Sequence, residues 1–175
     1  MSDPRTANLL GALVLALGDE LGAATTEGAG HGAAFPAAIV TVGANPGWTI
    51  ERLRRALGLS HSGTVRLLDR LEAEGIVERR AGQDGRSVAL SLTTAGRRSY
   101  NRILQARRSA MSSALASLSG AERGQLIRIT EKLLHGLTRD LEHSDHICRL
   151  CEEDVCPQDS CPVNCAAMER SGTAN

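Results

Sequence analysis

The sequence has very few aromatic side chains, since only Phe35, Trp48 and Tyr100 are aromatic among its 175 residues. An aromatic core is therefore excluded, and leucine, alanine, valine and isoleucine must form the interior. A ligand pocket with mainly aromatic walls is not expected either. Lysine is equally scarce, because Lys132 is the single lysine and the other basic residues are arginines.

Cysteine is absent from the first 147 residues, and all five cysteines lie between positions 148 and 165. The apolar run at residues 7–18 is too short to span a bilayer. Asp3 precedes this run and Asp19 and Glu20 follow it, which is unlike a secretory signal. We therefore expect a soluble, cytoplasmic protein with no membrane partner, in which the cysteines serve a metal or redox chemistry rather than structural disulfides.

The net charge is zero, but the charges are unevenly distributed. Residues 49–98 carry ten arginines against six acidic residues, a net charge of +4, and residues 99–140 also carry +4. Residues 1–48 carry −3 and residues 141–175 carry −5. A basic middle suits a polyanionic partner, although a solvated charged surface would give the same numbers.

Apolar spacing, helix caps and glycines predict the order of the elements. An apolar helix over 6–24 and a short helix over 36–44 come first. Two helices follow on either side of the turn at 58–63, the first capped by Thr49 and the second by Ser60 or Ser62. Alternating segments at 76–81 and 87–93 predict a β-hairpin. Two long helices complete the order, one capped by Thr94 over 95–118 and one opened by the Ser119–Glu122 capping box and carrying apolar residues as far as Leu141.

The two helices around the turn form a helix-turn-helix in this interpretation. Leu53 and Leu57 of the first pack on Val65 and Leu68 of the second. The second helix then presents a polar face whose members have the side chains that contact base edges and phosphates in a major groove. We predict DNA contacts by His61, Ser62, Gly63, Thr64, Arg66 and Arg70, with Gly63 allowing close approach of the backbone.

The hairpin carries arginines that suit the adjacent minor groove. These are Arg79, Arg80 and Arg86, and we add them to the predicted DNA-binding residues. Asp84 lies at the tip, and since a carboxylate repels phosphate we expect it to brace an arginine of its own hairpin.

The segment "NPGWTIERLRRALGLSHSGTVRLLDRLEAEGIVERRAGQDGRSVALSLTTAGRR" (45–98) resembles the winged helix of the multiple-antibiotic-resistance regulator (MarR) family. The resemblance implies a mainly α fold with a small β-hairpin wing, and a homodimer joined by the N-terminal and C-terminal helices. It implies a regulator, most often a repressor, on a pseudo-palindromic operator in double-stranded DNA. A small molecule or an oxidant as effector stays open, although the scarcity of aromatics and the cysteine-free winged segment argue against a phenolic ligand.

The cysteines follow the spacing Cys148-x2-Cys151-x4-Cys156-x4-Cys161, with Cys165 three residues beyond. This spacing resembles that of a zinc knuckle with cysteine in the histidine place, so the first four can bind Zn²⁺. Cys165 and His146 are alternate ligands. An iron–sulfur cluster is the rival cofactor because Cys-Pro occurs twice, and a metal-free thiol switch is the third alternative.

The sequence therefore predicts four regions: a dimerisation helix and joint at 1–35, the winged helix-turn-helix at 36–94, dimerisation helices at 95–144 and a cysteine-rich metal-binding tail at 145–175. The predicted function is transcriptional regulation. The alternative is a winged-helix module that binds protein and not DNA. An enzyme is not expected, because four cysteines leave a metal no open position.

Overall fold

The computed structural model describes residues 3–26, 32–82 and 87–172. It confirms a mostly helical chain with one two-stranded antiparallel hairpin. The elements in chain order are α1 (Pro4–Thr26), α2 (Ala34–Ala44), α3 (Ile50–Leu57), α4 (His61–Ala73), β1 (Val77–Ala81), β2 (Val88–Leu92), α5 (Thr94–Ala114), α6 (Gly120–Leu137), α7 (Leu141–Cys148), the 3₁₀ turn η1 (Glu153–Val155) and α8 (Pro162–Arg170).

The helix-turn-helix forms where the caps and glycines predict it. The Thr49 hydroxyl accepts a hydrogen bond from the backbone N–H of Arg52 at 3.3 Å and begins α3. Gly58 ends α3 in the left-handed region at φ 65°, where a side chain would be strained. Of the two predicted caps for the next helix, Ser60 is the one that the structure uses, since its hydroxyl accepts from the N–H of Gly63 at 3.1 Å.

The hairpin pairs Val77 with Leu92 and Ala81 with Val88. Its open end packs closely on the start of α5, because a Cβ atom at Gly96 would lie 2.0 Å from the carbonyl oxygen of Ile76. Only glycine leaves room for that backbone. The cap of α5 differs by one position from the predicted Thr94, since the Thr93 hydroxyl accepts from the N–H of Gly96.

The core is aliphatic, as the scarcity of aromatic residues predicts, and it is centred on α2. Nine of the eleven residues of α2 are buried, so this short helix is covered on all sides. The residues that pack around it include Leu53, Leu68, Leu71, Leu90 and Leu104. They come from α3, α4, β2 and α5, so the winged domain forms a single core.

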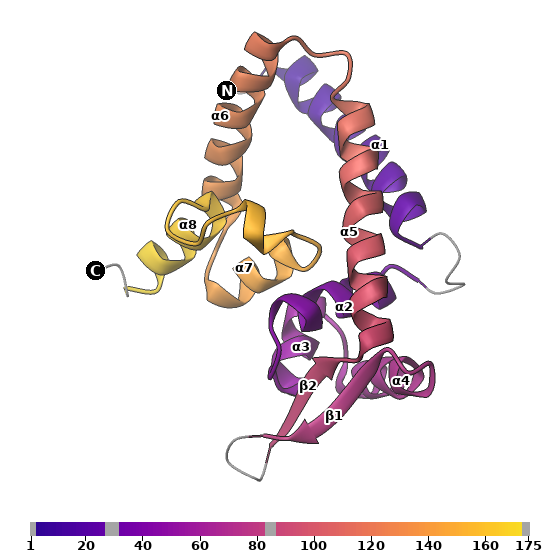
Figure 1. Cartoon of the computed structure of the whole chain (residues 1–175). Helices are drawn as coiled ribbons and strands as arrows, with labels where there is room; N and C mark the ends of the chain where they lie inside the picture. Colours follow the sequence, from indigo (N-terminus) through magenta and orange to yellow (C-terminus); the bar gives the residue numbers. More distant parts are fainter. Residues whose placement is uncertain (1–2, 27–31, 83–86, 173–175) are drawn as a thin grey trace.

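The helices outside the winged domain make two arms (Figure 1). The first arm is α1 lying along α5. The second is α6, which returns from the far end of α5 after the predicted capping box of Ser119 and Glu122. α6 ends at Leu137, so Leu141 belongs to the separate helix α7 and not to the long helix that the sequence predicted.

The cysteine-rich segment folds back between the second arm and the winged domain (Figure 1). α7 contacts α3, and α8 contacts both α6 and α7. Val163, Ala166 and Ala167 of α8 are buried in these contacts. The segment is therefore a packed part of the fold, whereas the sequence predicted a tail after the last dimer helix.

Candidate functional site

The outer face of α4 is the first candidate site. Its exposed residues are His61, Ser62, Arg66, Asp69 and Arg70. On the opposite face Leu68 and Leu71 are fully buried in the core of the winged domain. The leucines therefore fix α4 to the body of the domain while its polar side faces outward, beside the hairpin, as the sequence predicted.

Thr64 does not belong to that face. It is 0% exposed, and its hydroxyl donates to the carbonyl oxygen of Ser60 at 3.0 Å. The prediction that Thr64 points outward is wrong, because Thr64 is buried beside Leu68 whereas Val65, the predicted core contact, is only partly buried. A threonine whose hydroxyl bonds the preceding helical turn can occupy a core position, which a hydrophobic count overlooks.

Gly63 lies in the first turn of α4, where the Ser60 hydroxyl bonds its backbone N–H. A Cβ atom at this position would lie 3.1 Å from that hydroxyl oxygen. The glycine therefore has a local role in the cap, in addition to the close approach to DNA that the sequence suggests.

The arginines of the wing differ in their surroundings. Arg79 forms ion pairs with Asp69 at 2.7 Å and with Glu72 at 3.1 Å, so it joins β1 to α4. Its Nε atom is buried without a hydrogen-bond partner among the described residues. Arg80 is mostly exposed and pairs with Glu78 of its own strand at 2.6 Å. Asp84 and Arg86 lie outside the described residues, so the expected brace at the hairpin tip stays a prediction.

The cysteines are the second candidate site. Cys148, Cys151, Cys156 and Cys161 line one pocket, and all five cysteines are free thiols. Cys165 is not among the residues of that pocket, and its thiol points to the carbonyl oxygen of Asp159 at 3.5 Å. In residues 3–26, 32–82 and 87–172 no three His, Cys, Asp or Glu side chains form a ready metal-binding group. The predicted metal therefore stays a prediction.

The thiols of Cys148 and Cys151 shift each other's pKa in opposite directions. The hydrogen bond from Cys148 lowers the pKa of Cys151 to about 7, and the guanidinium groups of Arg107 and Arg149 favour the thiolate further, against the effect of burial. The same hydrogen bond and burial raise the pKa of Cys148. Desolvation raises the pKa of Cys156, and the neighbouring sulfurs of Cys161 and Cys151 act in the same direction. Such proximity of thiols is typical of sites that bind a cation or oxidise.

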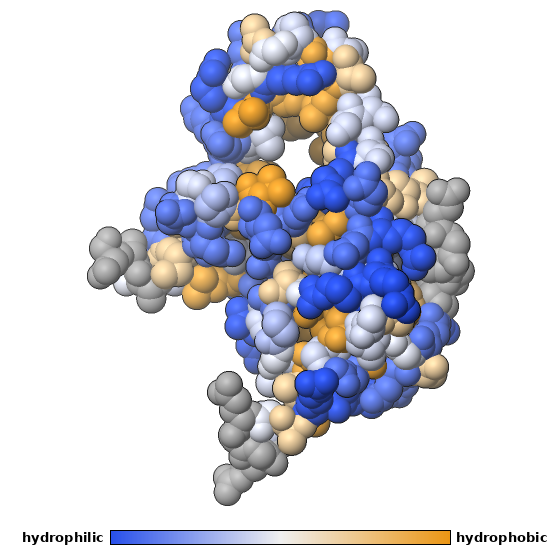
Figure 2. Space-filling view, viewed as in Figure 1, coloured by the Kyte–Doolittle hydropathy of each residue, from blue (hydrophilic) through white to orange (hydrophobic). Residues whose placement is uncertain are grey.

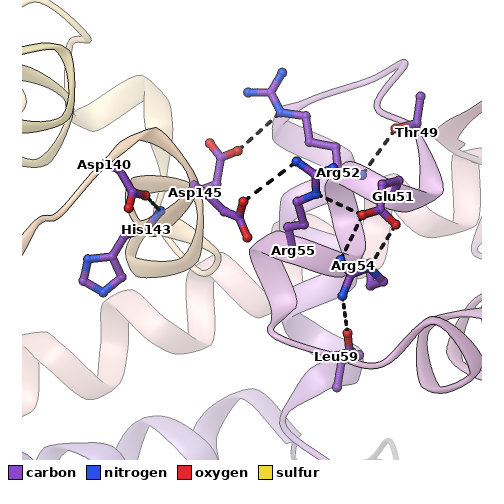
Figure 3. Close-up of polar contacts among 10 residues, drawn as sticks. Thr49, Glu51, Arg52, Arg54, Arg55, Leu59, Asp140, His143 and Asp145 are labelled. Atoms are coloured by element: carbon purple, nitrogen blue, oxygen red, sulfur yellow. Dashed lines mark hydrogen bonds and ion pairs between the residues drawn. The ribbon is translucent and has the colours of Figure 1, made fainter. Parts of the chain in front are cut away.

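The cysteine segment meets the first helix of the helix-turn-helix along α7. The Nδ1 atom of His146 lies 2.8 Å from the carbonyl oxygen of Ala56, and Asp145 pairs with Arg52 at 3.3 Å. Burial raises the pKa of Asp145 although Arg52 opposes this shift. Figure 3 shows Asp145 of α7 paired with Arg52 of α3, while Glu51 holds Arg54 and Arg55 of the same helix. His146, an alternate metal ligand in the sequence analysis, is thus engaged by α3.

The residues between the cysteines contact the rest of the winged domain. Thr41 of α2 donates to the carbonyl oxygen of Arg149 at 3.3 Å, and the side-chain amide of Asn45 donates to Glu153 at 3.2 Å. Glu152 pairs with Arg108 of α5. Sequence reasoning missed these contacts, and the one signal for them was the opposite charge of the middle and the C-terminal end.

The third candidate site is a cavity where α1, α2 and α5 meet. Its lining includes Thr25, Phe35, Ile39, Ser99 and Arg102. Phe35 is its one aromatic residue, in agreement with the expectation against aromatic walls, and Arg102 gives it a fixed cation that bonds the Ser99 hydroxyl at 3.2 Å.

Apolar side chains remain exposed on both arms. Figure 2 shows apolar surface in the upper part of the molecule, where these arms lie. α6 has no buried residue, and Thr25 is the single buried residue of α1. α1 is longer than the apolar run at residues 7–18, and by length and composition alone it could cross a membrane.

Comparison with known proteins identifies the winged domain. Residues 37–87 match the MarR family. Transcriptional repressor MprA of Escherichia coli (strain K12) is 33% identical over 103 residues, which are 57% of this chain and 58% of that protein. The chain thus spans little more than half the length of this curated relative. The relative is named a transcriptional repressor, which agrees with the sequence prediction of a regulator rather than an enzyme.

Solved structures have the same architecture. A MarR family protein of Mycobacterium tuberculosis in complex with p-aminosalicylic acid is 27% identical, with a TM-score of 0.58 over 73% of this chain and 96% of that one. FabT of Streptococcus pneumoniae in complex with DNA is 18% identical, with a TM-score of 0.63 over 76% of this chain and 95% of that one. The second likeness concerns the fold alone. The winged helix-turn-helix of this chain is thus similar to the MarR family, and the chain shares the fold of these relatives.

Proposed function

We propose that this protein is a homodimeric transcriptional regulator that binds double-stranded DNA through α4. The observation that carries the proposal is the outward polar face of α4, where Arg66 and Arg70 are exposed beyond a helix start with His61 and Ser62. Arginine grips guanine or phosphate, and short polar side chains reach base edges. The net charge of +4 over residues 49–98 supports a polyanionic partner.

The homodimer is supported by the uncovered arms. Most of the stability of a helix in a protein comes from packing of its apolar face, yet α6 has no buried residue. α6 exposes Ile127, Ile129, Leu133 and Leu137, and α1 exposes Leu13, Val14 and Leu15. A second copy that covers these side chains would place two α4 helices for the successive major grooves of one operator.

Repression is proposed because the curated relative MprA is a transcriptional repressor. A protein that acts on chromosomal DNA works in the cytoplasm, which is the location expected from the sequence.

The cavity between α1, α2 and α5 supports a small-molecule effector. The Mycobacterium tuberculosis relative was solved with p-aminosalicylic acid, an aromatic carboxylate. The scarcity of aromatic residues in the sequence argues against a phenolic ligand, so this proposal rests on the cation that Arg102 offers to the carboxylate. A thermal shift with salicylate that disappears in Arg102→Ala supports this effector, and an equal shift in both proteins contradicts it.

DNA binding is tested by titrating intact protein with duplex DNA at several salt concentrations. Phosphate contacts give a steep fall of affinity with salt, and Arg66→Ala should weaken binding by about 1–3 kcal/mol if the arginine contacts a base. Arg128→Ala, an exposed arginine on α6, is the control and should bind as the unchanged protein does. Absence of salt-dependent binding would favour the alternative, a winged-helix module for protein partners.

The dimer is tested by measuring molar mass in solution. Leu137 and Val155 are exposed to the same extent in the single chain, 65% and 67%. Leu137→Glu should produce monomers because a partner covers that position, whereas Val155→Glu should not. Equal masses for both variants would contradict the proposed interface.

A further inference from the structure

We propose that Cys148, Cys151, Cys156 and Cys161 bind one Zn²⁺ ion as four thiolates, and that the ion clasps the segment between them onto α2, α3 and α5 of the winged domain. The consequence for operator binding rests on the proposed function. The zinc site itself does not.

The backbone brings these four residues to one place. Cys148 ends α7, and the N–H of Cys151 bonds its carbonyl oxygen at 2.7 Å in a tight turn. Cys156 directly follows η1, and Cys161 is the N-cap of α8. Because α7 packs on α8, the two ends of the segment are held together and all four side chains line the same pocket.

The donor set suits zinc. Zn²⁺ takes four thiolates in a closed tetrahedral site and needs neither sulfide nor an electron donor. On binding, each of the four Sγ atoms that is still protonated releases its proton to solvent and forms a bond to the ion. The four thiols line one pocket together with Arg107. The ion therefore replaces protons at a place where thiols already lie near one another.

The middle of the segment has little burial to hold it, although Leu150 packs against the core and Glu152 and Glu153 contact the winged domain. Residues 154–160 are all exposed, and Val155, its one large apolar side chain, is 67% exposed. Burial therefore contributes little to ordering it. Among the described residues, the four sulfurs do not form a metal-binding group. Binding of the ion therefore requires residues 152–160 to move toward it. Such coupling of ligation to local folding is common in small zinc sites.

The contacts to the winged domain come from residues between or beside the ligands. Arg149 lies between Cys148 and Cys151, and its carbonyl oxygen accepts from Thr41 of α2. Glu152 and Glu153 lie between Cys151 and Cys156, and they contact Arg108 of α5 and Asn45, the C-cap of α2. His146 and Asp145, directly before Cys148, contact α3. An ion bound at the cysteines would therefore fix three helices of the DNA-binding domain relative to α6 and α8.

The site is tested by metal analysis of protein purified anaerobically. We expect one zinc per chain, four thiols protected from a thiol reagent and one reactive thiol. Cys165→Ser is the matched control, since Cys165 lies outside the pocket, and it should keep zinc. Cys156→Ser should bind Zn²⁺ at least about tenfold more weakly. Co²⁺ in place of Zn²⁺ should give the absorption bands of a tetrahedral thiolate site, which a structural role of the cysteines alone would not produce.

Three results would overturn the site: a colourless protein without metal, a brown protein with iron and sulfide, or a disulfide among the four cysteines in anaerobic protein. If Cys156→Ser does not fold, removing zinc from the intact protein with a chelator and restoring it with zinc chloride gives the same test.

The clasp is tested by hydrogen exchange before and after the chelator. Exchange should accelerate in residues 39–46 and 141–156 and stay unchanged in residues 120–133 of α6. Bound zinc with unchanged exchange in the first two ranges would overturn the clasp. If zinc binds and its removal accelerates exchange as expected, but the protein binds no DNA with or without zinc, the proposed function is refuted and this inference stands.

Discussion

The Nδ1 atom of His146 lies 2.8 Å from the carbonyl oxygen of Ala56, and this contact joins residues that are 90 positions apart in the sequence. His146 belongs to the cysteine segment, whereas Ala56 is a buried residue of the first helix of the helix-turn-helix. The position of α3 therefore depends on α7.

Replacing His146 by alanine should lower the free energy of unfolding by about 1 kcal/mol, because a partly buried hydrogen bond is lost. Chemical denaturation measures the change. Glu142→Gln is the control, since Glu142 lies at the surface and pairs with Arg55 only at 3.8 Å. Equal effects of the two substitutions would contradict a specific role of His146.

Gly96→Ala should destabilise the protein by roughly 1–3 kcal/mol, because the new Cβ meets the carbonyl oxygen of Ile76 and backbone must move. Gly120→Ala, at the start of α6, has no atom within 4 Å of the added Cβ and should change stability by no more than about 0.5 kcal/mol. Thermal unfolding of the two variants compares them, and a Gly96→Ala protein as stable as Gly120→Ala would refute the close packing of hairpin and α5.

Arg79→Met should lower stability by roughly 0.5–1 kcal/mol, since Arg79 connects the hairpin to Asp69 and Glu72 of α4. Arg80→Met should have little effect on stability, because Arg80 is mostly exposed and pairs within its own strand. Denaturant titration distinguishes the two. A larger loss for Arg80→Met would show that the hairpin is attached in another way.

Glu51 predicts a dependence of stability on pH. Hydrogen bonds from Arg54 and Arg55 lower the pKa of Glu51 from 4.5 to about 2. A carboxylate whose pKa is lowered in the folded state stabilises the protein above its unfolded pKa, and this contribution is lost as the pH falls through about 2. Glu51→Gln should therefore lose less stability between pH 6 and pH 3, which urea titrations at both values would measure. An identical loss in both proteins would contradict the assignment.

The winged domain and the start of α6 could be predicted from the sequence because their signals are local. The caps that begin α3, α4 and α6 are Thr49, Ser60 and the Ser119–Glu122 capping box, as predicted. The alternation of apolar residues predicts the hairpin. The errors are local too. Thr93 rather than Thr94 caps α5, and Thr64 is buried although threonine is polar.

The position of the cysteine segment could not be predicted, because it depends on long-range contacts. Nothing in the sequence near His146 indicates that its partner is Ala56. The sequence pattern also does not predict the short helix α7. Thr138 ends α6 and Asp140 begins α7 within a stretch whose apolar spacing predicts one continuous helix. The acidic C-terminal end and the basic middle were the available clue, and charge does not say which surfaces meet.

The central claim is that two copies of α4 contact one DNA duplex together. Hydroxyl-radical footprinting of intact protein on a duplex selected from random sequence tests it most directly. We expect two protected regions related by two-fold symmetry and centred about 10 base pairs apart or a multiple of that, which Arg66→Ala weakens and Arg128→Ala does not. A single asymmetric protected region, or protection that Arg66→Ala leaves unchanged, would contradict the claim.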